Sequence, residues 1–194
     1  MKNQTRAIFL DMDGVLNNDQ FIMDWIAKHG DSDASMAEFK KRYYRHNNVD
    51  GYLVPQLLGT FIWLCDETDC RIVWSSSWRQ DFWKPDIDTG EFHFDMHGVR
   101  RFWKAKGLPV ERLIGCTPCE NWSRFSYVPR GVEIQMWLDE NATRYNIGNV
   151  AILDDLEEAF YGVKYERARF FQTEFQFGLT DDIANATVSW LQND

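Results

Sequence analysis

Residues 8–16 read Ile-Phe-Leu-Asp-Met-Asp-Gly-Val-Leu, a short apolar run that leads into two acids, Asp11 and Asp13, and a glycine. The apolar run predicts a buried strand over residues 6–11. Ligands of open α/β sheets bind at the carboxyl ends of the strands, so both carboxylates are expected at a binding edge. Two like charges this close repel each other unless a cation or a shared proton relieves them. An Asp-Gly turn is the plainer interpretation, but it accounts for Asp13 and Gly14 alone.

Two later apolar strands also end in polar residues. One ends in Ser75 and Ser76, and the other in the paired acids Asp154 and Asp155. Hydroxyls and backbone N–H groups at a strand-to-helix junction can hold a phosphate, although a serine there also serves as an ordinary helix N-cap. Together with the first strand, these ends predict a site for a phosphate and a cation.

Two arginines stand near these strand ends. Arg130 opens an amphipathic pattern over residues 131–144 that predicts a helix. A cation at a helix N-terminus opposes the helix dipole, and neutralising an anion in the site would explain its presence. Arg79 follows the serine run and can make a bidentate phosphate contact, with an ion pair to a surface acid as the alternative.

In this order, the residues resemble the haloacid dehalogenase (HAD) superfamily of phosphohydrolases. The four motifs are the Asp-Met-Asp-Gly-Val-Leu stretch from Asp11, then Ser75, Arg130 and the pair Asp154-Asp155. The runs Ser-Ser-Ser-Trp-Arg, Ile-Gly-Cys-Thr-Pro and Arg-Gly-Val-Glu-Ile look more closely like the HAD domain of Swiss Army Knife RNA-repair proteins. The resemblance spans roughly residues 6 to 191.

The resemblance implies a mechanism. Asp11 would attack phosphorus and form an aspartyl-phosphate, and Asp13 would act as general acid and base. Mg²⁺ suits oxygen ligands, and the implied ligands are Asp11, the backbone carbonyl of Asp13, Asp154 and, through water or as an orienting group, Asp155. The implied phosphate-binding residues are Ser75, Ser76, Arg79 and Arg130.

Strands and helices alternate along the chain, which predicts an α/β, Rossmann-like (HAD-type) three-layer sandwich with a central, mostly parallel sheet. We expect one domain, 1–194, with a small helical cap insertion at about 17–52. The expected strands are 6–11, 70–75, 111–115, 149–154 and 168–172. The expected helices are 53–68, 96–107, 131–144, 155–162 and 180–192.

A small insertion leaves the site open, which suits a nucleotide or a phosphorylated nucleic-acid end. The segment 40–46, Lys-Lys-Arg-Tyr-Tyr-Arg-His, interleaves cations with aromatics as a nucleic-acid surface would. A solvated helix face with two buried tyrosines is the favoured explanation, and the net charge of −9 argues against tight, non-specific binding of polyanions. Two alternatives stay open: a phosphatase of another small phosphometabolite, and a non-catalytic protein that binds a phosphorylated ligand.

No apolar run approaches the about 18 residues that span a membrane. The N-terminus runs directly into the first strand without a signal peptide, so a cytoplasmic protein is expected. The spacing of Cys65, Cys70, Cys116 and Cys119 is compatible with a four-thiolate zinc site. Structural thiols are the favoured interpretation because Cys65 falls within an apolar helix. The sequence does not specify the oligomeric state.

Overall fold

The computed structural model describes residues 4–43, 51–85, 92–118 and 128–193. A five-stranded sheet with the order β5-β2-β1-β6-β7 forms its centre, and all of its pairings are parallel. The strands are β1 (Thr5–Leu10), β2 (Arg71–Trp74), β5 (Leu113–Cys116), β6 (Ile147–Asp154) and β7 (Ala168–Gln172). This sheet confirms the predicted α/β class, and each strand overlaps the stretch predicted for it.

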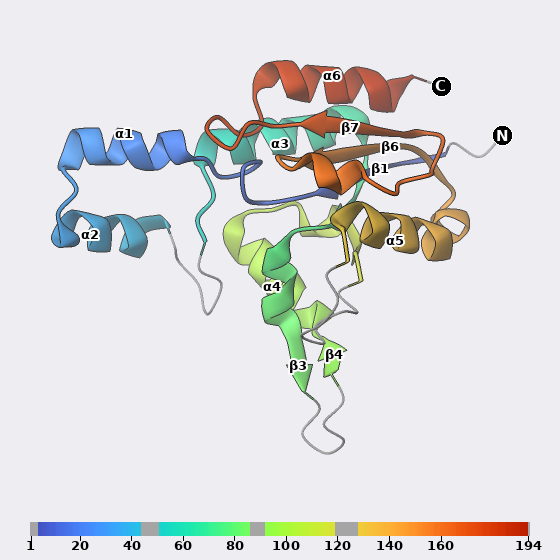
Figure 1. The fold of residues 1–194 in the computed structure, drawn as a ribbon, viewed down its shortest axis with the longest axis horizontal. Coiled ribbons are helices and arrows are strands. Elements are labelled where there is room, and N and C mark those ends of the chain that lie inside the picture. Colours follow the sequence, from blue (N-terminus) through green and yellow to red (C-terminus); the bar gives the residue numbers. More distant parts are fainter. Residues whose placement is uncertain (1–3, 44–50, 86–91, 119–127, 194) are drawn as a thin grey trace.

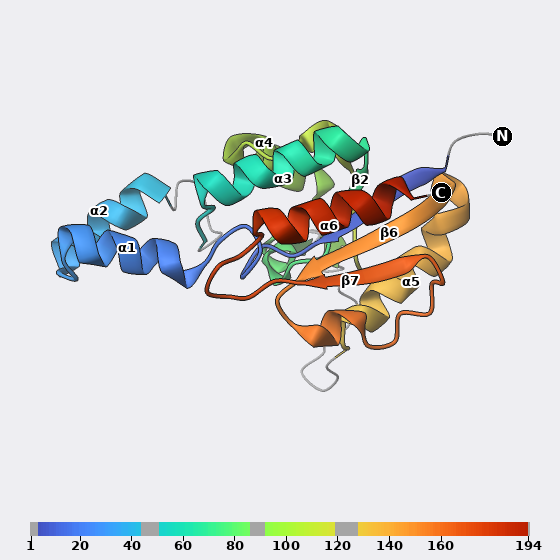
Figure 2. The same cartoon turned by 90° about the horizontal axis from the view of Figure 1, so that it is seen from above.

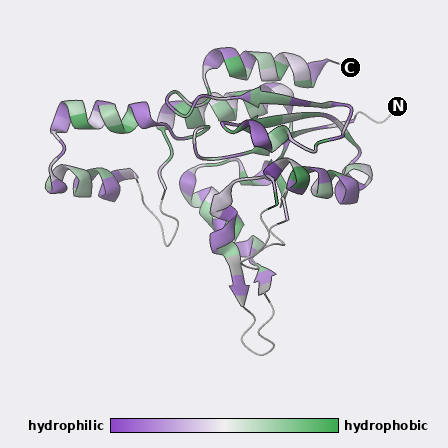
Figure 3. Ribbon diagram, viewed as in Figure 1, coloured by the Kyte–Doolittle hydropathy of each residue, from purple (hydrophilic) through white to green (hydrophobic). Residues whose placement is uncertain are grey.

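Helices cover both faces of the sheet. Helices α3 (Pro55–Thr68) and α6 (Asp181–Gln192) lie on one face, and α5 (Arg130–Tyr145) lies on the other (Figures 1 and 2). Alternate β1 side chains divide between the faces, with Ile8 in the core that includes α3, α6 and α4 (Met96–Lys106), and Phe9 in the core under α5. The surrounding helices carry both hydrophilic and hydrophobic residues (Figure 3), as helices with one buried face do.

The sheet order places a reversal of direction at β1. The chain runs outward from β1 to β2 and β5, then returns to β6 and β7 on the other side. Such a reversal opens a crevice at the carboxyl ends of the strands. The backbone ladder continues one residue past the strands, because Ser75 N–H donates to Leu10 O (2.8 Å) and Asp11 N–H donates to Leu153 O (3.0 Å). The residues that follow β2, β1 and β6 are therefore held side by side.

Two helices lie within the predicted insertion. Helices α1 (Asp19–His29) and α2 (Asp33–Tyr43) form a hairpin that extends beyond the sheet (Figures 1 and 2). Phe39 of α2 is fully buried among the insertion's own aromatics, with Val54 before α3 and Leu57 in its first turn. This separate core joins the hairpin to α3. Its action as a cap stays a prediction.

The predicted helix over 155–162 is wrong. The chain forms a single 3₁₀ turn there, η3 (Glu157–Phe160). Leu156 is extended, with its N–H donating to Asp154 Oδ1, and Gly162 follows the turn at φ +90°. The aspartate side chain competes with the helical hydrogen-bond pattern at this point.

The segment between η1 (Ser77–Phe82) and α4 contains a short antiparallel ribbon, β3 (Trp83–Pro85) and β4 (Phe92–Phe94). A further 3₁₀ turn, η2 (Val110–Arg112), precedes β5. Within the described ranges, no helix has both the length and the apolar character needed to cross a membrane.

Candidate active site

Three carboxylates meet at the carboxyl ends of β1 and β6. Asp11, Asp154 and Asp155 each offer an oxygen atom, and these atoms lie within 4.8 Å of one another. The parallel register pairs Leu10 with Leu153, so the acids that follow the two strands must emerge together. Asp11 and Asp154 are buried, whereas Asp155 is partly exposed. This concentration of negative charge, largely removed from water, requires a compensating cation.

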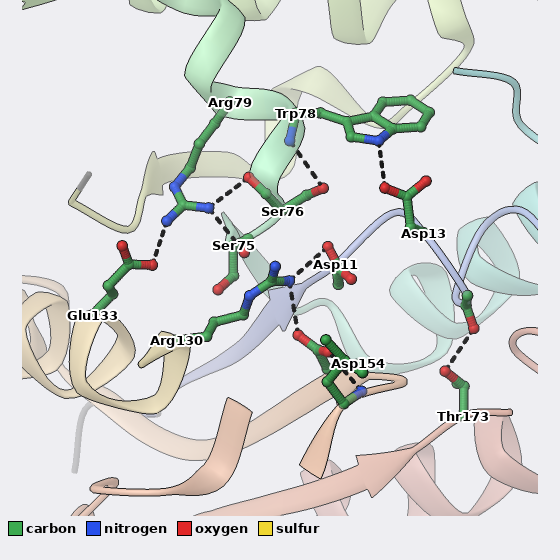
Figure 4. Close-up of polar contacts among 12 residues, drawn as sticks. Asp11, Asp13, Ser75, Ser76, Trp78, Arg79, Arg130, Glu133, Asp154 and Thr173 are labelled. Atoms are coloured by element: carbon green, nitrogen blue, oxygen red, sulfur yellow. Dashed lines mark hydrogen bonds and ion pairs between the residues drawn. The ribbon is translucent and has the colours of Figure 1, made fainter. Parts of the chain in front are cut away.

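Arg130 supplies part of that compensation. Its Nη1 lies 2.7 Å from Asp11 Oδ1 and 2.9 Å from Asp154 Oδ2, so one guanidinium bridges two carboxylates (Figure 4). Arg130 is the first residue of α5, and a Cβ on the next residue, Gly131, would collide with the backbone of Tyr161. The glycine thus lets the start of α5 approach closely and places the arginine in the site. Burial would lower the pKa of Arg130, but the two carboxylates outweigh it and raise this pKa.

The environment favours the protonated forms of the three acids when no metal is bound. Burial raises the pKa of Asp11, although Arg130 and hydrogen bonds from Met12 N–H and the Ser76 side chain oppose the rise. Burial, with the repulsion of Asp11, raises the pKa of Asp154 to about 7. The same two causes, burial first, raise the pKa of Asp155. One arginine therefore does not fully balance the cluster.

The residues present fit a hard divalent cation. Carboxylate oxygens from separate strand ends are the ligand type that Mg²⁺ prefers, and Asp11, Asp154 and Asp155 offer them from one edge. Gly14 leaves room for this set, since a Cβ there would lie 2.7 Å from Asp155 Cβ. Gly14 also adopts φ +67°, a conformation that disfavours other residues. Magnesium binding by this cluster remains a proposal.

Asp13 lies outside the three-carboxylate cluster. Its Oδ1 accepts a hydrogen bond from Asn17 Nδ2 (2.8 Å), and its Oδ2 accepts one from Trp78 Nε1 (2.7 Å; Figure 4). Asn17 is fixed in turn, because its Oδ1 accepts from Gly14 N–H at 2.9 Å. Separate roles for Asp11 and Asp13 are therefore compatible with this geometry, since the two carboxylates have different partners.

The two predicted serines follow β2 at the same edge. Ser75 Oγ is buried and has no hydrogen-bond partner among the described residues. Ser76 is also buried, and its side chain bonds Asp11 and accepts from Trp78 N–H at 3.3 Å. A buried hydroxyl without a partner costs free energy and is suited to a ligand that arrives later.

Arg79 has a different surrounding from the one expected of a phosphate ligand. Its guanidinium is buried and donates to Glu133 and to the backbone carbonyls of Ser75 and Ser76 (Figure 4). It also donates to the backbone carbonyls of Thr117 and Pro118. These bonds engage every nitrogen of the guanidinium. The predicted phosphate contact of Arg79 stays a prediction, and the contacts present hold the serine turn against the end of β5.

Three residues of the site were not predicted from the sequence. Asn17 and Trp78 orient Asp13, and Glu133 balances Arg79. Trp78 and Glu133 occur in the runs that carried the resemblance, but nothing in their spacing indicates their partners. Each contact joins segments that are distant in sequence, apart from Asn17, which is four residues from Asp13.

Two other predicted features are partly described. Lys40, Lys41 and Arg42 are exposed in the last turn of α2, and the rest of the segment 40–46 beyond Tyr43 lies outside the described residues. Cys65 and Cys70 are free, buried thiols that form a hydrogen bond with each other. Cys116 Sγ lies 3.9 Å from Met96 Sδ, and Cys119 lies outside the described residues.

Comparison with known proteins identifies the family of the chain. A family model described as the HAD domain in Swiss Army Knife RNA repair proteins matches residues 7–184, nearly the whole chain. No curated protein and no solved structure matches it. The matched range includes all of the acids, serines and arginines described above. The chain therefore belongs to the family of HAD domains found in Swiss Army Knife RNA repair proteins.

Proposed function

We propose that this chain is a Mg²⁺-dependent phosphohydrolase that removes phosphate from a nucleotide or from a phosphorylated nucleic-acid end. The observation that carries the proposal is the bridge from Arg130 to Asp11 and Asp154, with Asp155 beside them. A carboxylate nucleophile toward phosphate needs positive charge around it, because two anions must approach each other. Family membership supports the same class of reaction.

Asp11 would begin the reaction. Its carboxylate oxygen attacks phosphorus in line, so that an oxygen–phosphorus bond forms while the bond to the leaving oxygen breaks. Asp13 donates a proton to that leaving oxygen, which departs as an alcohol. Asp13 then takes a proton from water, the water oxygen attacks the aspartyl-phosphate, and Asp11 is released with inorganic phosphate. General acid–base catalysis of this kind contributes about a hundredfold to ten-thousandfold in rate.

The remaining residues would hold the transferring group. Ser75 Oγ lacks a partner among the described residues, and it would donate to a non-bridging phosphate oxygen. Ser76 and Arg130 already contact Asp11, so they would meet the same group as it reaches Asp11. Mg²⁺ held by Asp11, Asp154, Asp155 and the Asp13 backbone carbonyl would neutralise charge on the phosphate.

The substrate class rests on the family and on the surface of the insertion. The family model is named for RNA repair proteins, and phosphorylated ends arise in broken nucleic acid. Lys40, Lys41 and Arg42 gather positive charge at the end of α2 in a chain of net charge −9. A local basic patch can guide a phosphate backbone even on an acidic protein.

Phosphate release with Mg²⁺ tests the proposal. The panel contains 5′- and 3′-nucleoside monophosphates, 5′- and 3′-phosphorylated oligonucleotides, and unrelated sugar phosphates. Asp11→Asn is the inactive control, and Asp24→Asn, on the exposed surface of α1, is its matched control. Preference for an oligonucleotide end or a nucleotide supports the proposal.

Two other outcomes would replace it. Preference for sugar phosphates would indicate a phosphatase of another metabolite. Tight binding of one compound with no turnover would indicate a protein that sequesters a phosphorylated ligand.

A further inference from the structure

The orientation of Asp13 depends on a tryptophan from another part of the chain. Trp78 belongs to η1, and its indole N–H donates to Asp13 Oδ2 at 2.7 Å. Asn17 holds the other carboxylate oxygen at 2.8 Å. With one donor on each oxygen, the plane of the Asp13 carboxylate is fixed from two directions. The indole donor lies 65 residues after Asp13 in the sequence, whereas Asn17 lies only four residues after it.

The indole ring is itself held in place. Trp78 is 7 % exposed, and its ring packs edge-on against Phe102 with 6.3 Å between centroids. The ring also packs against the backbone of Gly51. A Cβ at this position would clash with the indole carbons Cη2 and Cζ2. Gly51 O accepts from Lys106 Nζ at 3.1 Å, which ties this glycine to α4. The ring therefore has little freedom to move away from Asp13.

Gly51 has a particular place in the chain. It lies at the end of the predicted insertion at 17–52, and the next residue, Tyr52, donates its hydroxyl to Asn18 O at the start of α1 (2.5 Å). Two residues further on, Val54 N–H donates to Leu16 O at 2.9 Å. Both ends of the insertion thus meet beside Trp78.

We propose that Trp78 is the positioning residue for Asp13, and that Gly51 sets the place of its indole ring at the root of the insertion. This inference rests on the proposed function, because it assigns Trp78 to the proton transfer that Asp13 performs. The indole N–H holds the carboxyl where the leaving oxygen departs. It touches no reacting atom itself. The Trp78 side chain thus contacts both Gly51, where the insertion ends, and Asp13, the proposed acid–base residue.

The leaving group distinguishes positioning from simple packing. An alkoxide leaving from a nucleoside monophosphate needs its proton as the bond breaks, whereas p-nitrophenolate leaves readily without one. A displaced Asp13 therefore harms the first substrate more than the second. The ratio kcat/KM covers the steps up to phosphoryl transfer, so it reports on this protonation.

The experiment compares kcat/KM for a nucleoside monophosphate and p-nitrophenyl phosphate in four variants. Trp78→Phe keeps an aromatic ring against Gly51 and loses the N–H. Gly51→Ala keeps Trp78 and forces the ring away. Trp103→Phe is the control for the first, since its indole nitrogen is buried without a hydrogen-bond partner among the described residues. Gly59→Ala is the control for the second, since a Cβ there meets nothing within 4 Å.

We expect Trp78→Phe and Gly51→Ala to lower kcat/KM for the nucleoside monophosphate about tenfold to a hundredfold, as small misplacements of catalytic groups do. The ratio for p-nitrophenyl phosphate should change by less than about threefold, and both control variants should match the unsubstituted protein for both substrates. Thermal unfolding of each variant confirms that it is folded at the assay temperature.

Equal losses on both substrates, or no loss on either, would overturn the role of Trp78 while leaving the proposed function intact. Selective loss in Trp78→Phe without the same loss in Gly51→Ala would overturn the role of Gly51. No turnover by the unsubstituted protein on p-nitrophenyl phosphate, on nucleoside monophosphates or on phosphorylated oligonucleotides would overturn the proposed function, and this inference with it.

Discussion

Arg130 carries the charge balance of the site at the scale of single residues. It is the cation that lies between Asp11 and Asp154, at 2.7 and 2.9 Å, and both of these acids are buried. Removing one member of a buried ion pair leaves an uncompensated charge, which costs far more than the intact pair contributes. Arg130 therefore serves both the stability of the metal-free protein and the proposed chemistry.

Arg130→Gln should destabilise the metal-free protein by about 3–5 kcal/mol, because Asp11 and Asp154 then face each other without compensation. The loss of this positive charge should also lower kcat for phosphate release by about a hundredfold to a thousandfold. Urea unfolding and the phosphate-release assay measure the two effects. Arg144→Gln, an exposed change in the last turn of the same helix, is the control. An active, fully stable Arg130→Gln protein would contradict this role.

Arg79→Met tests the structural role of Arg79. The substitution leaves the half-buried Glu133 without its partner and removes the side-chain donor of four carbonyls, so a loss of about 3–5 kcal/mol of stability is expected. Chemical denaturation measures it, with the exposed Arg101→Met on α4 as the matched control. Unchanged stability together with a raised KM would instead support the phosphate contact predicted for Arg79.

The sequence predicted the acids of the site better than it predicted their supports. Asp11, Asp154 and Asp155 follow apolar runs, and parallel strands bring such ends together whatever the details. Trp78 and Glu133 act through contacts 65 and 54 residues away, to Asp13 and Arg79 respectively. Arg79 illustrates the same limit, because an arginine after a serine turn is equally suited to a phosphate and to buried carbonyls.

At the scale of elements, periodicity predicted the long segments and failed at a short one. Residues 7–10 of β1 and 150–153 of β6 are apolar without interruption, as in strands buried on both faces. The expected helix at 155–162 does not form, because Leu156 N–H donates to the Asp154 side chain (Oδ1) and not to a helical carbonyl. Periodicity over eight residues is too weak to show such competition.

The start of α1 depends on Asn18. Its Oδ1 caps the helix by accepting from Phe21 N–H (3.0 Å), and its Nδ2 donates to Phe177 O (2.8 Å). Asn18→Ala should therefore cost about 1 kcal/mol and speed amide hydrogen exchange in α1 (Asp19–His29), while β1 and β6 stay protected. Thr180→Ala, which removes the N-cap of α6, is the control and should act on α6 alone. Faster exchange throughout the sheet would show that the hairpin does not open separately.

At the scale of the whole molecule, the site concentrates buried acids in a chain whose net charge is −9. The proposed Mg²⁺ ion would relieve this repulsion where it is strongest. Metal binding should therefore couple to pH and to global stability, and not to activity alone.

The metal-free protein should lose stability as the pH rises from 5 to 8. Burial, with the nearby Asp11 charge, raises the pKa of Asp154 to about 7, above its value in the unfolded chain. The folded protein then binds more protons than the unfolded one in this range, so the free energy of unfolding falls with pH. Thermal unfolding measures this, at about 2–4 °C per kcal/mol for a chain of this size.

Added Mg²⁺ should raise Tm more at pH 8 than at pH 5, because binding requires ionised carboxylates. Asp154→Asn should weaken both the pH dependence and the Mg²⁺ effect. Asp139→Asn, on the exposed face of α5, should change neither. An Asp154→Asn protein with an unaltered response to Mg²⁺ would show that the metal binds elsewhere.

Trapping of the phosphorylated protein tests the central claim most directly. The protein is mixed with a ³²P-labelled substrate and Mg²⁺, quenched in acid and digested, and the labelled peptide is identified. We predict label on the peptide that contains Asp11, more of it in Asp13→Asn, whose aspartyl-phosphate should hydrolyse slowly, and none in Asp11→Asn. Phosphate release without any label on that peptide, or release that persists in Asp11→Asn, would contradict the proposed mechanism.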